Sequence, residues 1–103
     1  MAERGVRCGG VAHFLIELYV SRVEGDAAVE RDAAQARLGA EVLTKEGKPV
    51  RYLRSIFVPE EETCFFMFEA DSAEDVEEAA RRVSLPVDRA AAVIAGPFGE
   101  EEL

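Results

Sequence analysis

The chain has no tryptophan, one histidine, two cysteines and four prolines. Cys8 lies in a glycine-rich stretch and Cys64 in an apolar run, so the spacing does not indicate a structural disulfide. Recognisable catalytic motifs are absent as well, since the letters contain no glycine-rich phosphate loop, no CxxC and no HExxH. The sequence therefore offers no motif support for a metalloenzyme or a nucleotide-dependent enzyme.

Positive charge is also scarce. Twelve Lys and Arg stand against 21 Asp and Glu, which gives a net charge of −9 and a pI near 4.6. Such a surface repels nucleic acid and anionic membranes. The longest apolar run, residues 14–20, is interrupted by Glu17 and is too short to cross a bilayer, and no secretion signal is recognisable. We therefore expect no nucleic-acid partner, no membrane association and a cytoplasmic location.

The length of 103 residues suits one domain, because two cores would each be too small to bury enough surface. Residues 1–10 contain three glycines and no periodicity, and residues 99–103 are mostly acidic. We predict a flexible N-terminal segment at 1–10, a single domain at 11–98 and an acidic tail at 99–103.

Four segments have the composition of β-strands, with many β-branched and aromatic residues. They are residues 11–21, 50–58, 63–70 and 88–95. The connection from Pro59 to Glu62 is short and acidic, which favours a hairpin between the second and third strands.

Two helices separate the strands. Apolar residues recur at steps of three and four through residues 25–47, with Asp26 as the expected N-cap. A capping box at Ser72 to Asp75 begins a second helix, which ends near Ser84, before Pro86. The resulting order, β-α-β-β-α-β, predicts an α+β fold of the ferredoxin-like type, with both helices on one side of the sheet.

The predicted strands are apolar on both faces, although a sheet covered by helices on one side usually alternates. In the first strand, the expected helix side is Phe14, Ile16, Leu18 and Val20, and the other side is His13, Leu15, Glu17 and Tyr19. The expected hairpin pairs are Phe57 with Cys64, Ile56 with Phe65, Arg54 with Met67 and Tyr52 with Glu69. This register places Leu53, Phe57, Phe66 and Phe68 on the helix side. Because the opposite face is too apolar for water, we predict a homodimer, a dimeric α+β barrel.

Five polar side chains should meet on that opposite face. They are Glu17, Tyr19, Tyr52, Arg54 and Glu69, with Arg54 close to Glu69. A charge in an apolar interior needs a partner, so the set is consistent either with a structural ion pair at the dimer interface or with a ligand-binding site. His13 is expected to be a partly solvated packing residue, and Cys64 an inert core thiol.

Two function classes follow from this set. A cofactor-free enzyme, as dimeric α+β barrels sometimes are, would need Glu17 or Glu69 as its acid or base. Arg54 beside these carboxylates favours their charged form, so we prefer a non-catalytic module that binds a small molecule, and catalysis stays open. Arg54 would grip an anionic or carbonyl group while Tyr19 and Tyr52 donate hydrogen bonds. The residues predict neither a cofactor nor a metal.

Several of these segments resemble a known family. The quoted pieces are residues 14–17, residues 50–55 running into 57–60, residues 65–70 and residues 85–89. They are similar to the small bacterial ferredoxin-like proteins of a domain-of-unknown-function family often labelled nickel-binding, over about residues 13–95. The resemblance implies a dimeric ferredoxin-like fold. It also implies nickel as a possible ligand, which nothing else in the sequence indicates. Family members with the metal label tend to carry a histidine at the position of Arg54, which is a permanent cation here and not a nickel ligand.

Overall fold

The computed structural model describes residues 12–93. Its elements are β1 (Ala12–Tyr19), α2 (Gly25–Lys45), β2 (Val50–Val58), a 3₁₀ turn η1 (Pro59–Glu61), β3 (Thr63–Ala70), α3 (Ala73–Arg82) and β4 (Arg89–Val93). The predicted order and the ferredoxin-like α+β fold are confirmed. The predicted segments 1–10 and 99–103, and residues 11 and 94–98 of the predicted domain, lie outside the described residues.

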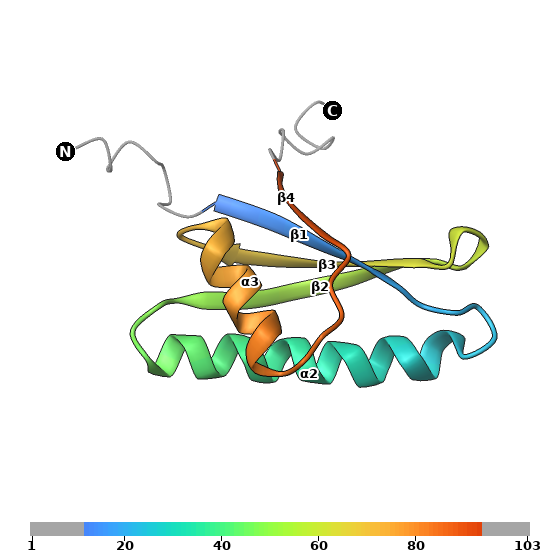
Figure 1. Ribbon diagram of the computed structural model, residues 1–103, viewed down its shortest axis with the longest axis horizontal. Coiled ribbons are helices and arrows are strands. Elements are labelled where there is room, and N and C mark those ends of the chain that lie inside the picture. Colours follow the sequence, from blue (N-terminus) through green and yellow to red (C-terminus); the bar gives the residue numbers. More distant parts are fainter. Residues whose placement is uncertain (1–11, 94–103) are drawn as a thin grey trace, which may run out of the picture.

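The four strands form one antiparallel sheet in the order β2-β3-β1-β4. In Figure 1 the long helix α2 runs along the strands and α3 lies across it. No helix within residues 12–93 combines the length and the apolar character needed to cross a membrane. The sheet therefore has one face covered by helices and a second face, which we call the open face, without a covering element in the described part of the chain.

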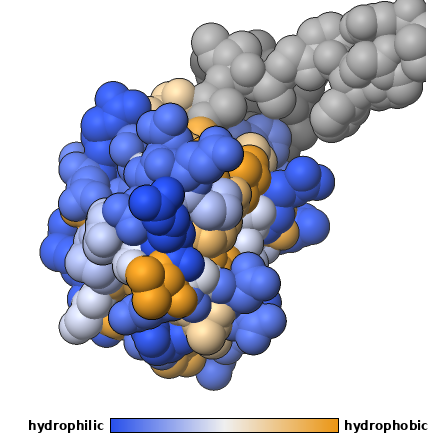
Figure 2. Space-filling model, turned by 90° about the vertical axis from the view of Figure 1, so that its right-hand side faces the viewer, coloured by the Kyte–Doolittle hydropathy of each residue, from blue (hydrophilic) through white to orange (hydrophobic). Residues whose placement is uncertain are grey.

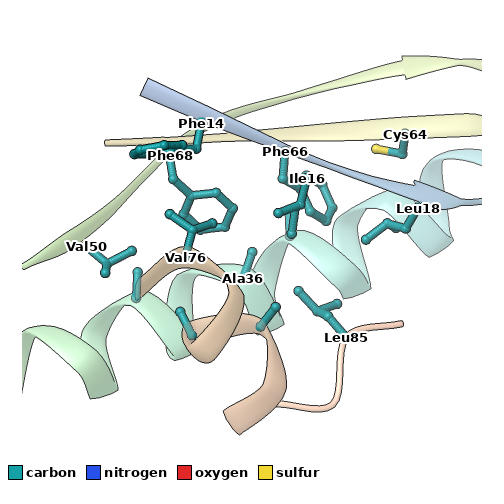
Figure 3. Packing of buried hydrophobic residues seen from close by; sticks show 14 of the residues in the cluster. Phe14, Ile16, Leu18, Ala36, Val50, Cys64, Phe66, Phe68, Val76 and Leu85 are labelled. Atoms are coloured by element: carbon teal, nitrogen blue, oxygen red, sulfur yellow. The ribbon is translucent and has the colours of Figure 1, made fainter. Parts of the chain in front are cut away.

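The core fills the space between the sheet and the helices (Figure 3). The strands contribute alternate residues to it. Strand β1 buries Phe14, Ile16 and Leu18, and β3 buries every second residue from Cys64 to Ala70. Helix α2 contributes mainly alanines, which allow it to lie close to the sheet and to α3. The alternation predicted for the first strand is thus confirmed, and Cys64 is a fully buried core residue as expected.

The two helices begin differently. Ser72 caps α3 as predicted, since its hydroxyl accepts a hydrogen bond from the Asp75 N–H at 3.2 Å. The predicted N-cap of α2 is wrong, because the helix begins at Gly25 and Glu24 occupies the cap position without a side-chain bond. Asp26 lies inside the first turn instead, where its negative charge interacts favourably with the positive end of the helix dipole.

An exposed ion network joins the ends of the two helices. The Arg82 guanidinium donates to both carboxylate oxygens of Glu46 at 2.7 and 2.9 Å, and to Glu78 Oε2 at 2.6 Å. Hydrogen bonds from Arg82 lower the pKa of Glu46, and bonds from Arg81 and Arg82 lower the pKa of Glu78. This bidentate geometry fixes the orientation of the α2 C-terminus against α3.

The β2–β3 hairpin contains a β-bulge that the sequence does not reveal. Three predicted pairs are confirmed: Phe57 with Cys64, Ile56 with Phe65, and Arg54 with Met67. Beyond them the register shifts between Tyr52 and Arg54, which leaves Leu53 without a partner. The predicted pair of Tyr52 with Glu69 is therefore wrong, and Glu69 lies opposite Arg51.

The bulge also changes which face two residues occupy. Tyr52 pairs with Phe68 and lies on the helix side, where its ring meets Phe66 and Phe68 edge-on at centroid distances of 5.8 and 5.7 Å. Leu53, expected on the helix side, is the unpaired residue of the bulge and is only half-buried. One extra residue in β2 thus exchanges the two faces for the residues on the N-terminal side of the bulge, relative to the predicted register.

The surface is largely hydrophilic where Figure 2 views it, with hydrophobic patches between charged regions. Large apolar side chains that are exposed within residues 12–93 are Tyr19, Val23, Leu38 and Ile56. Tyr19 and Ile56 belong to strands and lie on the open face, at 60% and 42% exposure. The open face therefore exposes large apolar side chains to water, and this exposure needs an explanation.

Candidate functional site

The open face carries the residues of each strand that alternate with the core residues. Its apolar middle consists of Leu15 on β1, Phe65 and Met67 on β3, Ile56 on β2 and Ala91 on β4. In the single chain Leu15, Phe65 and Met67 are half-buried and Ile56 is exposed. These side chains adjoin one another across four strands, so they form one continuous apolar stripe.

Glu69 lies at one end of this stripe, between two basic partners. Its Oε1 is 3.4 Å from Arg51 Nη1, and its Oε2 is 3.4 Å from His13 Nε2. All three residues occupy one row of the sheet, because His13 and Arg51 both pair with Glu69 in the ladders. Arg54 pairs with Met67 as predicted, but the ion pairs of Glu69 within residues 12–93 are with Arg51 and His13, because the bulge places Arg51 opposite Glu69. His13 is half-buried, as expected for a partly solvated packing residue.

Glu17 lies toward the other end of the stripe and pairs with β4. Arg89 Nε donates to Glu17 Oε1 at 3.2 Å, and the two residues are partners in the β1–β4 ladder. Between Glu17 and Phe65 there is a hollow of about 30 Å³, which also touches Leu15, Arg89 and Ala91. That is the volume of roughly one water molecule in the liquid, so this hollow cannot hold an organic ligand.

The five predicted site residues are thus only partly brought together. Glu17, Tyr19, Arg54 and Glu69 lie on the open face, but Tyr52 lies on the opposite face. Arg54 stands opposite Met67 and makes no ion pair within residues 12–93. Tyr19 is four ladder positions away, roughly 13 Å along the strands. In one subunit, the backbones of Arg54 and Tyr19 therefore lie well apart on the open face.

Two functional side chains were not anticipated from the sequence. Arg51 replaces Arg54 as the partner of Glu69 because of the bulge. Arg89 pairs with Glu17 because β4 lies next to β1. The pair of Arg89 with Glu17 could have been predicted from the sequence. The ferredoxin-like order places the last strand beside the first, and Arg89 lies near the start of the last strand.

The metal-ligating groups on the described residues are few. No group of three or more His, Cys, Asp or Glu side chains within residues 12–93 is arranged to hold a metal ion. His13 and Glu69 offer one imidazole nitrogen and one carboxylate close together, with Arg51 beside the same carboxylate. One subunit therefore supplies at most a pair of ligands there, and a neighbouring cation opposes a dication.

Cys64 is the cysteine within residues 12–93, and its surroundings make its thiol inert. Burial raises the pKa of its thiol to about 11, with the charge of Asp32 as a second cause and a backbone hydrogen bond at Ile56 acting the other way. The thiolate is the nucleophilic form, so this residue does not serve as a nucleophile near neutral pH.

The raised pKa of Cys64 predicts a specific loss of stability in alkali. In the unfolded chain the thiol ionises near its ordinary pKa of 9.0, whereas the folded chain keeps the proton up to about 11. The unfolded state then binds fewer protons, so the free energy of unfolding falls as the pH rises from about 9 to 11, by roughly 1–3 kcal/mol. Urea titrations at several pH values measure this, and Cys64→Ala is the control that should lack this part of the slope. Parallel curves for the two proteins would contradict the prediction.

Comparisons with known proteins agree with the fold. A family model described as "Nickel responsive protein SCO4226-like" matches residues 14–93. Among solved structures, the crystal structure of SCO4226 from Streptomyces coelicolor A3(2) is similar, with a TM-score of 0.63 and 24% sequence identity over 84% of this chain and 100% of that chain. No curated protein matches the sequence significantly.

Proposed function

We propose that this chain, which belongs to the family of SCO4226-like nickel-responsive proteins, is a homodimeric, non-catalytic module that binds a small molecule between two open faces. The observation that carries the proposal is the apolar stripe of Leu15, Ile56, Phe65, Met67 and Ala91, which spans the sheet opposite the helices. An apolar centre with charged residues at its ends has the composition of a protein interface.

A second copy of the chain is the partner that suits this face. In a two-fold dimer the same patch meets itself, so each end of the stripe must tolerate the other end. Both ends carry both signs of charge: Glu69 with Arg51 and His13 at one, and Glu17 with Arg89 at the other. Two antiparallel copies can therefore place carboxylates of one subunit beside guanidinium groups of the other.

Arg54 supports the ligand-binding part of the proposal. Its neighbour across the ladder is Met67, and within residues 12–93 no carboxylate pairs with it. A dimer would remove this guanidinium from most of the water, and a buried charge needs a partner. A small molecule with a carboxylate or carbonyl group would provide that partner, held by the planar fork of Arg54.

Binding is preferred over catalysis because both carboxylates of the open face already have basic partners. Glu17 is paired with Arg89, and Glu69 with Arg51 and His13. These are arrangements of structural ion pairs, and a general acid or base would need a carboxylate free to exchange a proton with a substrate.

Sedimentation velocity at micromolar concentration tests the dimer. We expect the wild-type chain to sediment as a dimer and Met67→Lys, in the middle of the stripe, to sediment as a monomer because it places a charge in the apolar centre. Leu38→Lys is the matched control, since Leu38 is an exposed apolar residue on α2. Circular dichroism verifies that both variants are folded. A monomeric wild type, or equal behaviour of the two variants, would refute the proposed interface.

The ligand is tested with pyruvate, which carries both a carboxylate and a carbonyl group. Amide resonances of Arg54, Met67 and Leu15 should move in the wild-type dimer and stay in place in Arg54→Gln. If pyruvate moves none of the open-face amide resonances of the dimer, the ligand-binding part of the proposal is wrong and the dimer is a structural assembly only.

Nickel binding is the second candidate, and the family description together with the His13–Glu69 pair favours testing it. Each subunit offers one such pair, an imidazole nitrogen and a carboxylate oxygen, which are ligands of the types that nickel accepts. Calorimetry with nickel and zinc chloride decides: under the first proposal no stoichiometric uptake is expected. One ion per subunit, lost in both His13→Ala and Glu69→Gln, would establish the metal function instead.

A further inference from the structure

A second concave surface lies on the other side of the molecule, between α2 and the edge strand β2. It is a groove of about 330 Å³ whose lining includes Arg37, Ala40 and Lys45 from the helix and Val50, Arg51 and Tyr52 from the strand. A neighbouring hollow of about 350 Å³ shares Thr44, Val50 and Arg51 with it. Together with Glu41 and Thr44, which also line the groove, the helical residues recur at steps of three and four, so they face the strand from successive turns.

The charge of this groove is opposite to that of the whole chain. Its lining contains three cationic side chains, Arg37, Lys45 and Arg51, and one carboxylate, Glu41. The complete chain carries a net charge of −9. Within residues 12–93 neither Arg37 nor Lys45 makes an ion pair, and Arg51 reaches only Glu69 at 3.4 Å. A local excess of positive charge in an acidic protein attracts anions to that place.

The groove is also preorganised. The guanidinium carbon of Arg37 lies 5.3 Å from the centroid of the Tyr52 ring, a cation–π arrangement. The same ring is held edge-on by Phe66 and Phe68, both buried in the core. One rigid aromatic ring therefore positions a cation at the mouth of the groove, and a ligand need not order it.

The backbone of β2 adds a donor. The Thr44 hydroxyl donates to the Val50 carbonyl at 3.0 Å and accepts from the Val50 N–H at 3.1 Å, so both backbone groups of Val50 point away from β3. Backbone groups alternate in direction along a strand, and those of Tyr52, two residues on, point the same way. Because β2 is an edge strand, we expect the Tyr52 N–H to point out of the sheet edge on the side of the groove.

We infer that this groove binds a small organic anion with a flat apolar body. The anionic group would lie between Arg37, Lys45 and the Tyr52 N–H, and the apolar body would rest on Ala40, Val50 and the aromatic ring. The proposed anion position, at Arg37, Lys45 and Tyr52, lies on the helix side of the sheet, although Arg51 at the rim of the groove also pairs with Glu69 of the open face.

The test uses benzoate as the probe and nuclear magnetic resonance as the readout. Benzoate should displace the amide resonances of Ala40, Thr44 and Tyr52 with a Kd of about 1 mM, as expected for so small a ligand in an exposed groove. Benzamide has the same shape without the charge, and acetate has the charge without the ring. Each should bind roughly tenfold more weakly, because each lacks one half of the recognition.

Variants locate the site. Arg37→Gln combined with Lys45→Gln should raise the Kd for benzoate about tenfold. Arg22→Gln, which removes a cation outside the groove, should leave it unchanged. Four results would overturn the inference: no displacement by benzoate, equal binding of benzoate and benzamide, equal loss in the control variant, or displacements confined to the open-face amides of Leu15 and Met67. The last of these would support the proposed function and reject the groove.

Discussion

Truncation of Phe66 to alanine is expected to lower the free energy of unfolding by about 3–5 kcal/mol. The side chain is fully buried between the sheet and the helices, and its ring contacts Tyr52 edge-on. The change removes apolar surface from the core and leaves a cavity that the packed alanines of α2 cannot fill. Since a domain of this size is stable by roughly 5–15 kcal/mol, such a loss would bring it close to unfolding.

Phe65→Ala is the matched control, because it makes the same chemical change one residue away on the opposite face of β3. Phe65 is only half-buried in the single chain, so its loss should lower stability by less than about 2 kcal/mol. It should instead weaken dimerisation, which urea unfolding at several protein concentrations and sedimentation measure together. Equal stability losses in the two variants would contradict the assignment of the two faces.

Replacement of Gly39 by alanine is expected to destabilise the protein by about 1–3 kcal/mol or more. Gly39 is buried where α2 crosses α3, and a Cβ there would overlap the Ala79 carbonyl and lie 3.3 Å from Val83 Cγ2. The contact is with backbone, so no side chain can turn aside and the helices must separate.

The sign of this effect separates packing from helix propensity. In an unhindered helix, alanine is favoured over glycine by about 1 kcal/mol, so propensity alone predicts stabilisation. Ala34→Gly at an exposed position of the same helix measures that contribution and serves as the control. Thermal and urea unfolding of both variants give the comparison. A Gly39→Ala protein as stable as the wild type would show that the helices do not approach each other this closely.

The faces of β1 and β3 could be predicted because neither strand contains a bulge, so side chains keep the period of two along the whole of both strands. Phe14, Ile16 and Leu18 were assigned to the core from period-two spacing alone, and the capping box at Ser72 identified the start of α3. Cys64 was placed in the core by the same parity. In these segments, the local sequence and the tertiary environment favour the same arrangement.

The sequence by itself determined the element order, the ferredoxin-like fold and the existence of a second, partly apolar sheet face, because these depend on periodicity and composition. Only the tertiary structure decided which polar residues meet on that face. The bulge at Leu53 moves Tyr52 to the helix side and brings Arg51 to Glu69. Both faces of β2 are mixed in polarity, so shifting its register by one residue leaves no clear mark in the hydrophobic pattern. The groove at the β2 edge depends on the same shift, because it needs Tyr52 on the helix side, and on the packing of α2 against β2, which brings Arg37 over the ring of Tyr52.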